Sequence, residues 1–246
     1  EAARVASVKG HEVVLFEKET TLGGQLNIAS VPPRKSEMNR ALRYLTNEMK
    51  ELHVDLRLGR TADAEMILAE NPDNVIVAAG AHNVIPPIEG SKMPHVFDAW
   101  KVLNHEELPS GRVVVIGGGL VGLETADTLA TDGCEVTVLE MKDSIGSDLG
   151  SLRKIAVMMK MQQLQVKLLP NSKVCKFTEE GIVLEDGTQI PCECAVFAVG
   201  FLANDSHPLA EVCEKRKLPY YVIGDAKSAR RALDAIAEGF EVARTL

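Results

Sequence analysis

Three glycines at the spacing Gly117-x-Gly119-x-x-Gly122 are the residues in this sequence best suited to hold a phosphate group. Gly117 permits a tight turn, Gly119 lets the backbone approach a pyrophosphate, and Gly122 lets a helix pack closely on a strand. A helix that begins at such a loop offers free N–H groups and the positive end of its dipole to an anion. An acidic residue, Glu140, follows at about the distance of 20 residues that the dinucleotide-binding fingerprint requires.

The elements around these glycines decide how much the motif means. Val113–Ile116 reads as a short buried strand directly before the loop, and a helical pattern follows the loop directly. A GxGxxG motif without these flanking elements is weak evidence for nucleotide binding, because it also fits a glycine-rich turn in an ordinary α/β domain. Between a strand and a helix it predicts a dinucleotide-binding βαβ unit.

The second half of this unit occurs twice in the chain. Residues Glu124–Glu140 (ETADTLATDGCEVTVLE) match Glu1–Glu17 (EAARVASVKGHEVVLFE) without a gap, and both copies read as helix, glycine turn and strand ending in glutamate. The glycine loop of the first copy would fall just before residue 1. We therefore expect the chain to be a fragment of a longer protein, with a first dinucleotide-binding domain that lacks its first strand and loop.

The rest of the sequence supplies the elements of two α/β domains. We expect helices and strands at the following places: a helix over 36–52, a strand over 54–58, a helix over 64–70, a strand over 74–79, a helix over 152–164, a strand over 166–169, a hairpin over 182–193, a strand over 195–199, a strand over 220–223 and a helix over 229–246. Residues 81–110 are proline-rich and read as an irregular crossover. This order predicts a discontinuous first domain, 1–106 with 213–246, around a second domain, 107–212.

Composition excludes several classes of function. The net charge of −8 without a basic block argues against nucleic-acid binding, which needs clustered Lys and Arg. No apolar run reaches the roughly 20 residues that cross a bilayer, so no membrane partner is expected. The five cysteines are odd in number and scattered, which favours a reducing cytoplasm over a disulfide framework. The six histidines are dispersed, and no metal site is predicted. The oligomeric state is left open.

Several stretches together resemble the flavoproteins with two dinucleotide-binding domains, both Rossmann-like. These stretches are LFEKETTLGGQL, VIVAAGA, VVVIGGGLVGLETA, FAVGF and YVIGDA. More narrowly, GGQLNIASVPPRKSEM and FDAWKVL resemble the C-terminal half of multidomain NADH:flavin oxidoreductases related to old yellow enzyme. That group includes enoate reductase, 2,4-dienoyl-CoA reductase and the trimethylamine dehydrogenase type. The resemblance runs over nearly the whole chain.

The resemblance implies an FAD site in the first domain. Glu17 would bind the adenosine ribose, Lys18 would lie by the adenine, and Asp225 would accept a hydrogen bond from a ribityl hydroxyl. Further residues would line the pyrophosphate and ribityl chain or bring backbone close to the cofactor: Gly23, Gly24, Gln25, Ala79, Gly80 and Gly224. For Lys18 a surface role, and for Gly224 and Asp225 an ordinary turn, are the competing interpretations.

For the second domain the resemblance implies a site for the nicotinamide dinucleotide. Glu140 would bind the adenosine 2′-OH and repel a 2′-phosphate, so NADH is favoured over NADPH, although Lys142 lies close by. Glu124 would sit near the nicotinamide or play a capping or packing role, and Gly200 would end a strand against the dinucleotide. The glycine loop would cradle the cofactor through Gly117, Gly119, Leu120, Val121 and Gly122.

Cysteine is missing where disulfide reductases of this architecture carry their redox pair. The region after Gly24 reads QLNIASVPPRK, so a dithiol relay is excluded. Cys192-x-Cys194 would lie on one face of a hairpin strand and pack in the core, since two thiols alone rarely bind a metal. The FMN domain and 4Fe-4S cluster of the family would lie upstream, outside this chain.

Two functional hypotheses from different classes follow. In the first, NADH reduces FAD, and electrons pass upstream to an activated C=C bond; the flavin does the chemistry, and no side chain of the chain is needed as an acid or base. In the second, the fold carries ADP as a structural module, as in the trimethylamine dehydrogenase type. A stand-alone NADH-dependent flavin reductase is a third alternative.

Overall fold

The computed structural model describes residues 1–246, and the contacts within it divide the chain into two compact units. Unit 1 consists of Glu1–Ser30, Ser36–His82 and Phe201–Leu246. Unit 2 consists of Val31–Lys35 and Asn83–Gly200. The chain therefore leaves unit 1 and later re-enters it.

The limits of these units differ from the predicted domain limits of 107 and 212. The segment expected to be an irregular crossover contains β4 (Ala81–Asn83), β5 (Val96–Asp98) and α5 (Ala99–Leu103). β5 pairs with a strand of unit 2, and α5 is buried in the core of that unit through Ala99, Val102 and Leu103. These contacts draw the segment from Asn83 onward into unit 2. The domain assignment as such remains a prediction.

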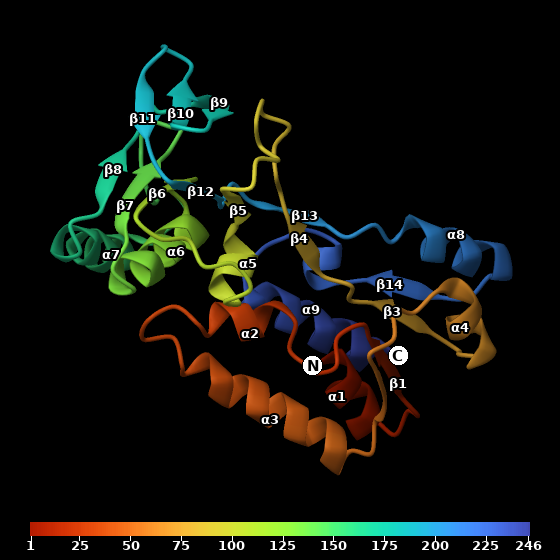
Figure 1. The fold of residues 1–246 in the computed structure, drawn as a ribbon. Helices are drawn as coiled ribbons and strands as arrows, with labels where there is room; N and C mark the ends of the chain where they lie inside the picture. Colours follow the sequence, from red (N-terminus) through yellow and green to blue (C-terminus); the bar gives the residue numbers. More distant parts are fainter. The chain divides into compact units, whose positions relative to one another are not determined.

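Unit 2 is built on a five-stranded parallel sheet in the order β5-β12-β6-β7-β8 (Figure 1). Its strands, besides β5, are β6 (Arg112–Ile116), β7 (Glu135–Leu139), β8 (Lys167–Leu169) and β12 (Cys194–Phe197). Strands buried on both faces read as continuous apolar runs, which is why the segments around Val113 and Ala195 could be predicted from the sequence.

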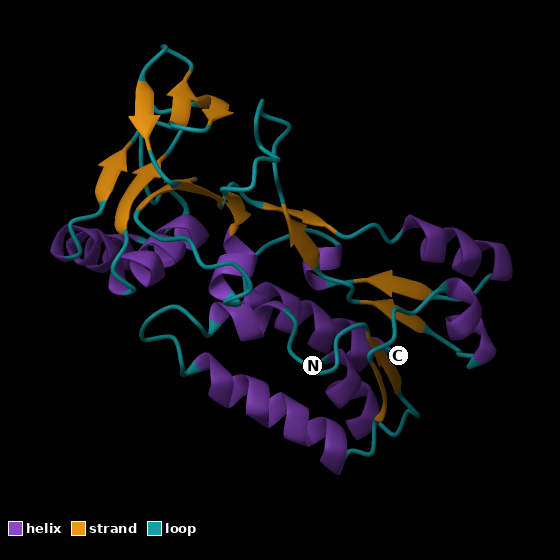
Figure 2. Cartoon of the chain, viewed as in Figure 1, coloured by secondary structure: helices purple, strands orange, loops and turns teal.

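Two different layers cover this sheet (Figure 2). On one face Val113, Val115, Val138 and Val196 pack against the helices α5, α6 (Leu120–Thr131) and α7 (Ser151–Gln163). The residues of opposite parity pack against a three-stranded antiparallel sheet formed by β9 (Val174–Thr178), β10 (Gly181–Leu184) and β11 (Gln189–Pro191). The predicted hairpin is therefore confirmed, whereas β9, its third strand, was not predicted.

Unit 1 contains two separate pairs of parallel strands instead of one sheet. The first pair is β1 (Val14–Glu17) with β2 (Asp55–Leu58), and the second is β3 (Val75–Val77) with β14 (Tyr220–Val222). A further short strand, β13 (Phe201–Ala203), pairs with β4.

Helices pack around both strand pairs of unit 1. They are α1 (Ala2–Val8), α2 (Gln25–Ala29), α3 (Met38–Glu51), α4 (Ala64–Ala69), α8 (His207–Arg216) and α9 (Ala232–Thr245), with a 3₁₀ turn at Gly224–Ala226. α1 packs on α9 through Val5, Ala6 and Ala243, so the first and last helices lie side by side (Figure 1). α4 and α8 cover β3, where Val75, Val77 and Cys213 form a small core. The helix α8 was not predicted.

The two copies of the sequence repeat have the same backbone geometry. Gly10 and Gly133 have φ angles of 93° and 95°, values that favour glycine. In each copy the next residue donates its N–H to the carbonyl five positions earlier, at 3.1 Å for His11 and 3.0 Å for Cys134. The repeat found in the sequence is therefore also a repeat of backbone structure.

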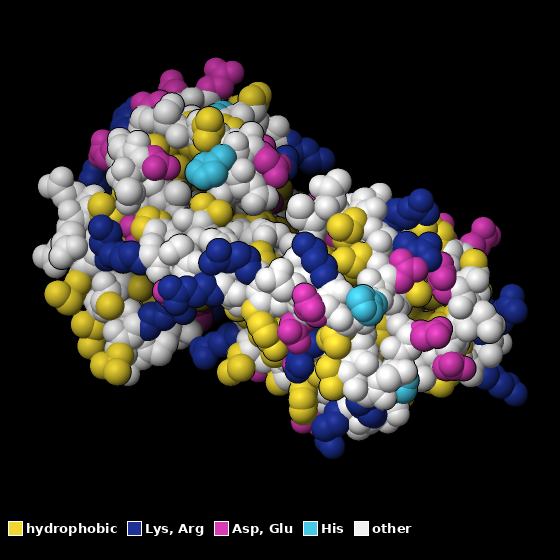
Figure 3. All heavy atoms as spheres, turned by 90° about the horizontal axis from the view of Figure 1, so that it is seen from below, with side chains coloured by type: hydrophobic (Ala, Val, Ile, Leu, Met, Phe, Trp, Pro, Cys, Tyr) yellow, Lys and Arg dark blue, Asp and Glu magenta, His cyan; other side chains and the backbone are white.

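The surface carries charges of both signs, and Figure 3 shows Lys and Arg interspersed with Asp and Glu. Hydrophobic side chains gather at the left edge of that face, on the side where α7 lies in Figure 1. On α7, Met161 is buried, but Leu152, Ile155 and Met159 are exposed. None of the helices combines the length and the apolar character that crossing a membrane requires.

Candidate dinucleotide-binding sites

The glycine loop of unit 2 forms a tight turn between β6 and α6. Gly117 has a φ of 110° and donates its N–H to the Leu139 carbonyl at 2.8 Å, which ties the loop to the end of β7. A Cβ atom added to Gly117 would lie 2.3 Å from the Ala198 carbonyl oxygen. Both the angle and the close approach therefore require glycine.

Gly122 allows α6 to start directly on the strand. A Cβ atom there would lie 1.8 Å from the Gly117 carbonyl oxygen, which is far inside contact distance. Gly119 is the N-cap of α6 with an extended backbone, so the first N–H groups of the helix are free of helical partners. Inside the helix Thr125 donates its hydroxyl to the Val121 carbonyl at 2.8 Å, which satisfies a buried polar group.

Glu140 follows the end of β7 and holds the loop from the side. Its Oε2 accepts a hydrogen bond from Gly118 N at 2.8 Å, and its Oε1 accepts one from Lys142 N at 2.9 Å. The Lys142 side chain is exposed. The carboxylate is thereby fixed next to the glycine loop, at the carboxyl end of the sheet, where a ribose would lie if the loop holds a pyrophosphate.

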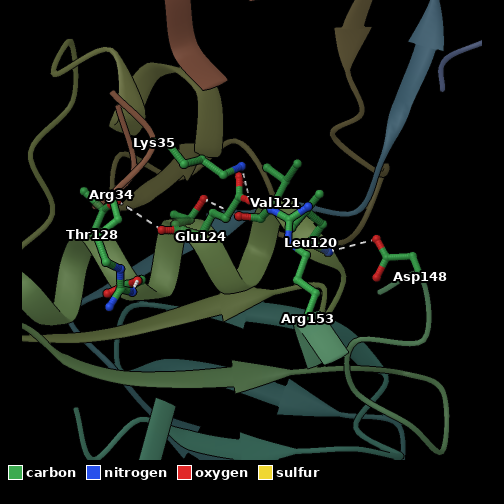
Figure 4. A network of polar contacts seen from close by, with 10 residues as sticks. Arg34, Lys35, Leu120, Val121, Glu124, Thr128, Asp148 and Arg153 are labelled. Carbon is green, nitrogen blue, oxygen red and sulfur yellow. Dashed lines mark hydrogen bonds and ion pairs between the residues drawn. The ribbon is translucent and has the colours of Figure 1, made fainter. Parts of the chain in front are cut away.

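An anionic group occupies the start of α6 in this structure. Asp148 accepts a hydrogen bond from Leu120 N through its Oδ2 at 2.9 Å, and Val121 follows in the same first turn (Figure 4). The carboxylate stands where the glycine motif would place a phosphate oxygen. A helix start that binds a carboxylate fits an anionic ligand such as the pyrophosphate of NAD(H).

Glu124, one turn into α6, is the centre of an ionic network (Figure 4). Its Oε1 pairs with Lys35 and, at 2.9 Å, with Arg153 Nη2, and its side chain is only 15% exposed. Arg34 pairs with Asp127 at 2.9 Å on the same helix. Arg34 and Lys35 come from Val31–Lys35, the short segment that belongs to unit 2, whereas Arg153 lies on α7.

Gly200 ends the segment that follows β12. It has a φ of 122°, a Cβ added to it would touch nothing within 4 Å, and its carbonyl accepts the N–H of Val84 at 3.0 Å. Because β6, β7 and β12 are parallel neighbours, the glycine loop and Glu140 both lie at the carboxyl ends of these strands. Gly200 lies a few residues beyond the end of β12. Open sheets of this kind bind ligands outside the carboxyl ends of their strands.

In unit 1, Glu17 ends β1 as Glu140 follows β7. Its Oε1 accepts the N–H of Glu19 at 2.9 Å, the same contact that Glu140 makes with Lys142. Lys18 is 65% exposed and lies 3.8 Å from Glu19, so nothing in the structure draws it toward a site. The ribose role of Glu17 and the adenine role of Lys18 stay predictions.

The loop containing Gly23 and Gly24 lies next to the segment that follows β3 in unit 1. Gly24 is the N-cap of α2, with a φ of 46°, and Gln25 begins the helix. The amide nitrogen of Gln25 would lie 3.5 Å from a Cβ on Gly80, whereas Gly23 packs against Leu42. This cluster offers open backbone at Gly24 and a donor at Gln25, which fits a phosphate or ribityl chain.

Two residues that were not predicted hold the expected FAD-side backbone. Asn204 donates its Nδ2 to the Ala79 carbonyl at 2.7 Å and its backbone N–H to the Gly80 carbonyl at 3.0 Å. Glu238 on α9 accepts the N–H of Gly224 at 2.7 Å and also pairs with Arg230. The hydrogen bond from Arg230, followed by that from Gly224, lowers the pKa of Glu238 below its usual value.

Asp225 accepts the N–H of Arg230 at 3.1 Å through its Oδ1. Gly224 and Asp225 follow β14, and Gly80 lies just beyond the neighbouring strand β3. The predicted FAD-side residues of 79–80 and 224–225 thus lie at the same ends of paired parallel strands. Their contacts with a cofactor stay predictions.

All five cysteines are free thiols. Cys192 is buried on one face of the unit 2 sheet and Cys194 packs toward the other, so the two thiols point to opposite cores. The predicted packing role is confirmed, but the predicted shared face is wrong, because Cys194 begins β12 instead of continuing β11. Burial raises the pKa of Cys192 to about 11.

Comparison with known proteins gives a consistent family. The model of the family "Pyridine nucleotide-disulphide oxidoreductase" matches residues 1–220. A bilirubin reductase of Mediterraneibacter gnavus (strain CC55_001C) is 64% identical over 252 residues, which cover 100% of this chain and 39% of that protein. An NADH oxidase of Thermoanaerobacter brockii is 37% identical, with 99% of this chain and 38% of that protein covered.

A solved structure of a 2-naphthoyl-CoA reductase complex has a TM-score of 0.91 to the chain at 29% identity. The superposition covers 100% of this chain and 38% of the reductase chain. The chain thus spans less than two-fifths of each of these three proteins, and the predicted resemblance to one region of multidomain flavin reductases is confirmed. The chain belongs to the pyridine nucleotide-disulphide oxidoreductase family of FAD-dependent NAD(P)H oxidoreductases, and its cofactors are FAD and NAD(H).

Proposed function

We propose that the chain is the module that passes electrons from NADH to FAD inside a longer flavin oxidoreductase. The observation that carries this proposal is the complete strand, glycine loop and helix of unit 2, with Glu140 fixed against Gly118 N at 2.8 Å. A bound nicotinamide supplies a hydride, and a bound flavin accepts it. The residues of the chain hold and orient the two cofactors.

On the NAD(H) side, the N–H groups at the start of α6 would bind the pyrophosphate, and the Glu140 carboxylate would bind the adenosine ribose. A 2′-phosphate would meet the negative charge of Glu140, so NADH is the preferred donor. Glu124 would lie near the nicotinamide, with Lys35 and Arg153 holding its carboxylate in one orientation. No residue of the chain has to gain or lose a proton in the hydride step.

On the FAD side, the proposal assigns the ribose to Glu17 and the pyrophosphate and ribityl chain to Gly24, Gln25 and Asp225. The backbone at Ala79 and Gly80, braced by Asn204, would lie against the same cofactor. An adenine contact is assigned to Lys18. The five free thiols support a reducing, cytoplasmic location.

The final electron acceptor belongs to the longer protein. Relatives named as a bilirubin reductase and a 2-naphthoyl-CoA reductase support an organic acceptor. The resemblance to the flavin oxidoreductases related to old yellow enzyme implies that this acceptor is reduced at an upstream FMN domain, reached through an iron–sulfur cluster. We assign that acceptor to the class with an activated C=C bond. Turnover of the full-length protein with NADH and either bilirubin or an enoate tests this assignment, and turnover of neither compound contradicts it.

The module itself is tested by its cofactor content. Small molecules are released from the purified chain by heat and separated, and the flavin spectrum is recorded; the chain is then reconstituted with FAD and mixed with NADH without oxygen. Bound FAD that is bleached by NADH supports the proposal. ADP in place of FAD, with no bleaching after reconstitution, supports a structural nucleotide-binding module instead.

A further inference from the structure

We infer that the Asp148 carboxylate occupies the position of the pyrophosphate in the NAD(H) site. Because this carboxylate has to move away before NAD(H) can bind, it lowers the affinity of the site. This inference rests on the proposed function of unit 2. It concerns one residue, outside the glycine motif, on the loop between β7 and α7.

The first observation is what Asp148 binds. Its Oδ2 accepts the N–H of Leu120, the first residue of α6, at 2.9 Å (Figure 4). The same oxygen would lie 3.3 Å from a Cβ on Gly119, so the carboxylate lies over the glycine whose missing side chain is meant to admit a ligand. A single N–H directed at one carboxylate cannot also be fully used by a phosphate oxygen.

The second observation is how the loop is anchored. Gly146 donates its N–H to the Gly118 carbonyl at 2.7 Å, and the Ile145 side chain is buried. Lys154 at the start of α7 donates to the Ser144 hydroxyl at 2.9 Å. The loop is therefore fixed to the glycine turn next to Asp148, and its position does not depend on the Asp148 contact.

The third observation is that Asp148 itself is free to move. Its side chain is exposed, and its one hydrogen bond is the contact with Leu120 N. Rotation of one exposed side chain can open the position while the loop stays in place. A carboxylate that has rotated away still lies near the pyrophosphate, and like charges at short range repel.

Binding of NAD(H) therefore has to replace one anion at the helix start with another. The net gain in binding free energy is therefore smaller than at a helix start whose N–H groups have no partner. The loss affects only the interaction with the pyrophosphate part of the ligand. Interaction of an exposed carboxylate with a helix N-terminus corresponds to an effect of about fivefold on a dissociation constant.

The test measures Kd for NADH by fluorescence titration with the 246-residue chain and the variants Asp148→Ala and Asp148→Asn. We expect both to bind NADH about fivefold more tightly, with Ala at least as strong as Asn because the Asn carbonyl still accepts from Leu120 N. Asp143→Asn is the matched control, since Asp143 is an exposed acid on the same loop. Circular dichroism verifies that all four proteins are folded.

Adenosine, displacing NADH in the same titration, separates the pyrophosphate from the rest of the ligand. Its affinity should be equal in the original chain and in the Asp148 variants, because it has no phosphate. Folded Asp148 variants that bind NADH no better than the original chain, or that also bind adenosine more tightly, overturn the inference. Absence of NADH binding in the original chain and in all variants instead refutes the proposed function, and this inference with it.

Discussion

Glu17 and Glu140, the last residues of the two repeat copies, each accept the backbone N–H of the residue two positions further on at 2.9 Å. The contact holds the carboxylate in one orientation before any ligand arrives. In the second copy the other oxygen also accepts from Gly118 N at 2.8 Å. A carboxylate held in this way would lose little conformational entropy on binding a ligand.

The choice between NADH and NADPH should depend on Glu140. The variant Glu140→Gln keeps the shape of the side chain but loses its charge. Its NH₂ group then faces a backbone N–H, of Gly118 or of Lys142, that needs an acceptor. We expect Kd for NADH to rise about tenfold, since hydrogen bonds to charged groups are the stronger ones, and Kd for NADPH to fall. Titration with both nucleotides gives the ratio.

Glu135→Gln is the control for this experiment. Glu135 lies at the start of β7, the strand that Glu140 follows, and pairs with the exposed Lys167 at 2.7 Å. It should leave both dissociation constants unchanged. A Glu140 variant with the original NADH-to-NADPH ratio would speak against the ribose role.

Packing of α6 on the glycine loop should fail when Gly122 gains a side chain. The Cβ of Gly122→Ala would start 1.8 Å from a backbone oxygen, and backbone cannot move aside as a side chain can. We expect a loss of about 2 kcal/mol or more in the free energy of unfolding, measured in denaturant. Gly150→Ala, where nothing lies within 4 Å, should change it by less than about 1 kcal/mol. Equal effects would refute the close approach.

The Lys35–Glu124 pair should be coupled more strongly than an exposed pair. Its side chains are 23% and 15% exposed, against 62% and 57% for Lys167–Glu135. A double-mutant cycle with Lys35→Met and Glu124→Gln should give about 1 kcal/mol or more of coupling, and the corresponding cycle at Lys167 and Glu135 about 0.5 kcal/mol or less. Coupling of the same size at both pairs would mean that burial adds nothing here.

Alkaline pH should destabilise unit 2 through Cys192. Burial raises its pKa from 9.0 to about 11, so between these values the unfolded chain loses the thiol proton while the folded chain keeps it. The free energy of unfolding should therefore be unaffected by this group below pH 9 and fall as pH rises toward 11. Cys192→Ala should make the decline between pH 9 and 11 shallower, as followed by urea unfolding at each pH. An unchanged slope in that variant would contradict the assignment.

The sequence predicted the parts of the fold whose signals are local. β6, the glycine loop and the start of α6 follow one another within about a dozen residues, and glycine is required at Gly117 and Gly122 by backbone geometry alone. β5 and β9 were missed, because each is a short strand defined by the partner it pairs with.

The same reason explains which site residues were missed. Asp148 is 28 residues from Leu120, and Lys35 is 89 residues from Glu124, so no spacing in the sequence connects them. Asn204 and Glu238 act on backbone groups and carry no motif of their own. An acidic residue in the loop after the fingerprint glutamate was the one visible signal for Asp148.

The assignment of Val31–Lys35 to unit 2 bears on how this unit can be produced alone. A protein cut at residues 83 and 200 would contain all of α6 but neither Arg34 nor Lys35, and Asp127 would have lost the arginine paired with it. A five-residue peptide supplied in trans, or a linker that restores these two side chains, is the natural remedy. The segment Val31–Lys35 is therefore part of the architecture of unit 2 although it is distant in sequence, and any excised version should include it.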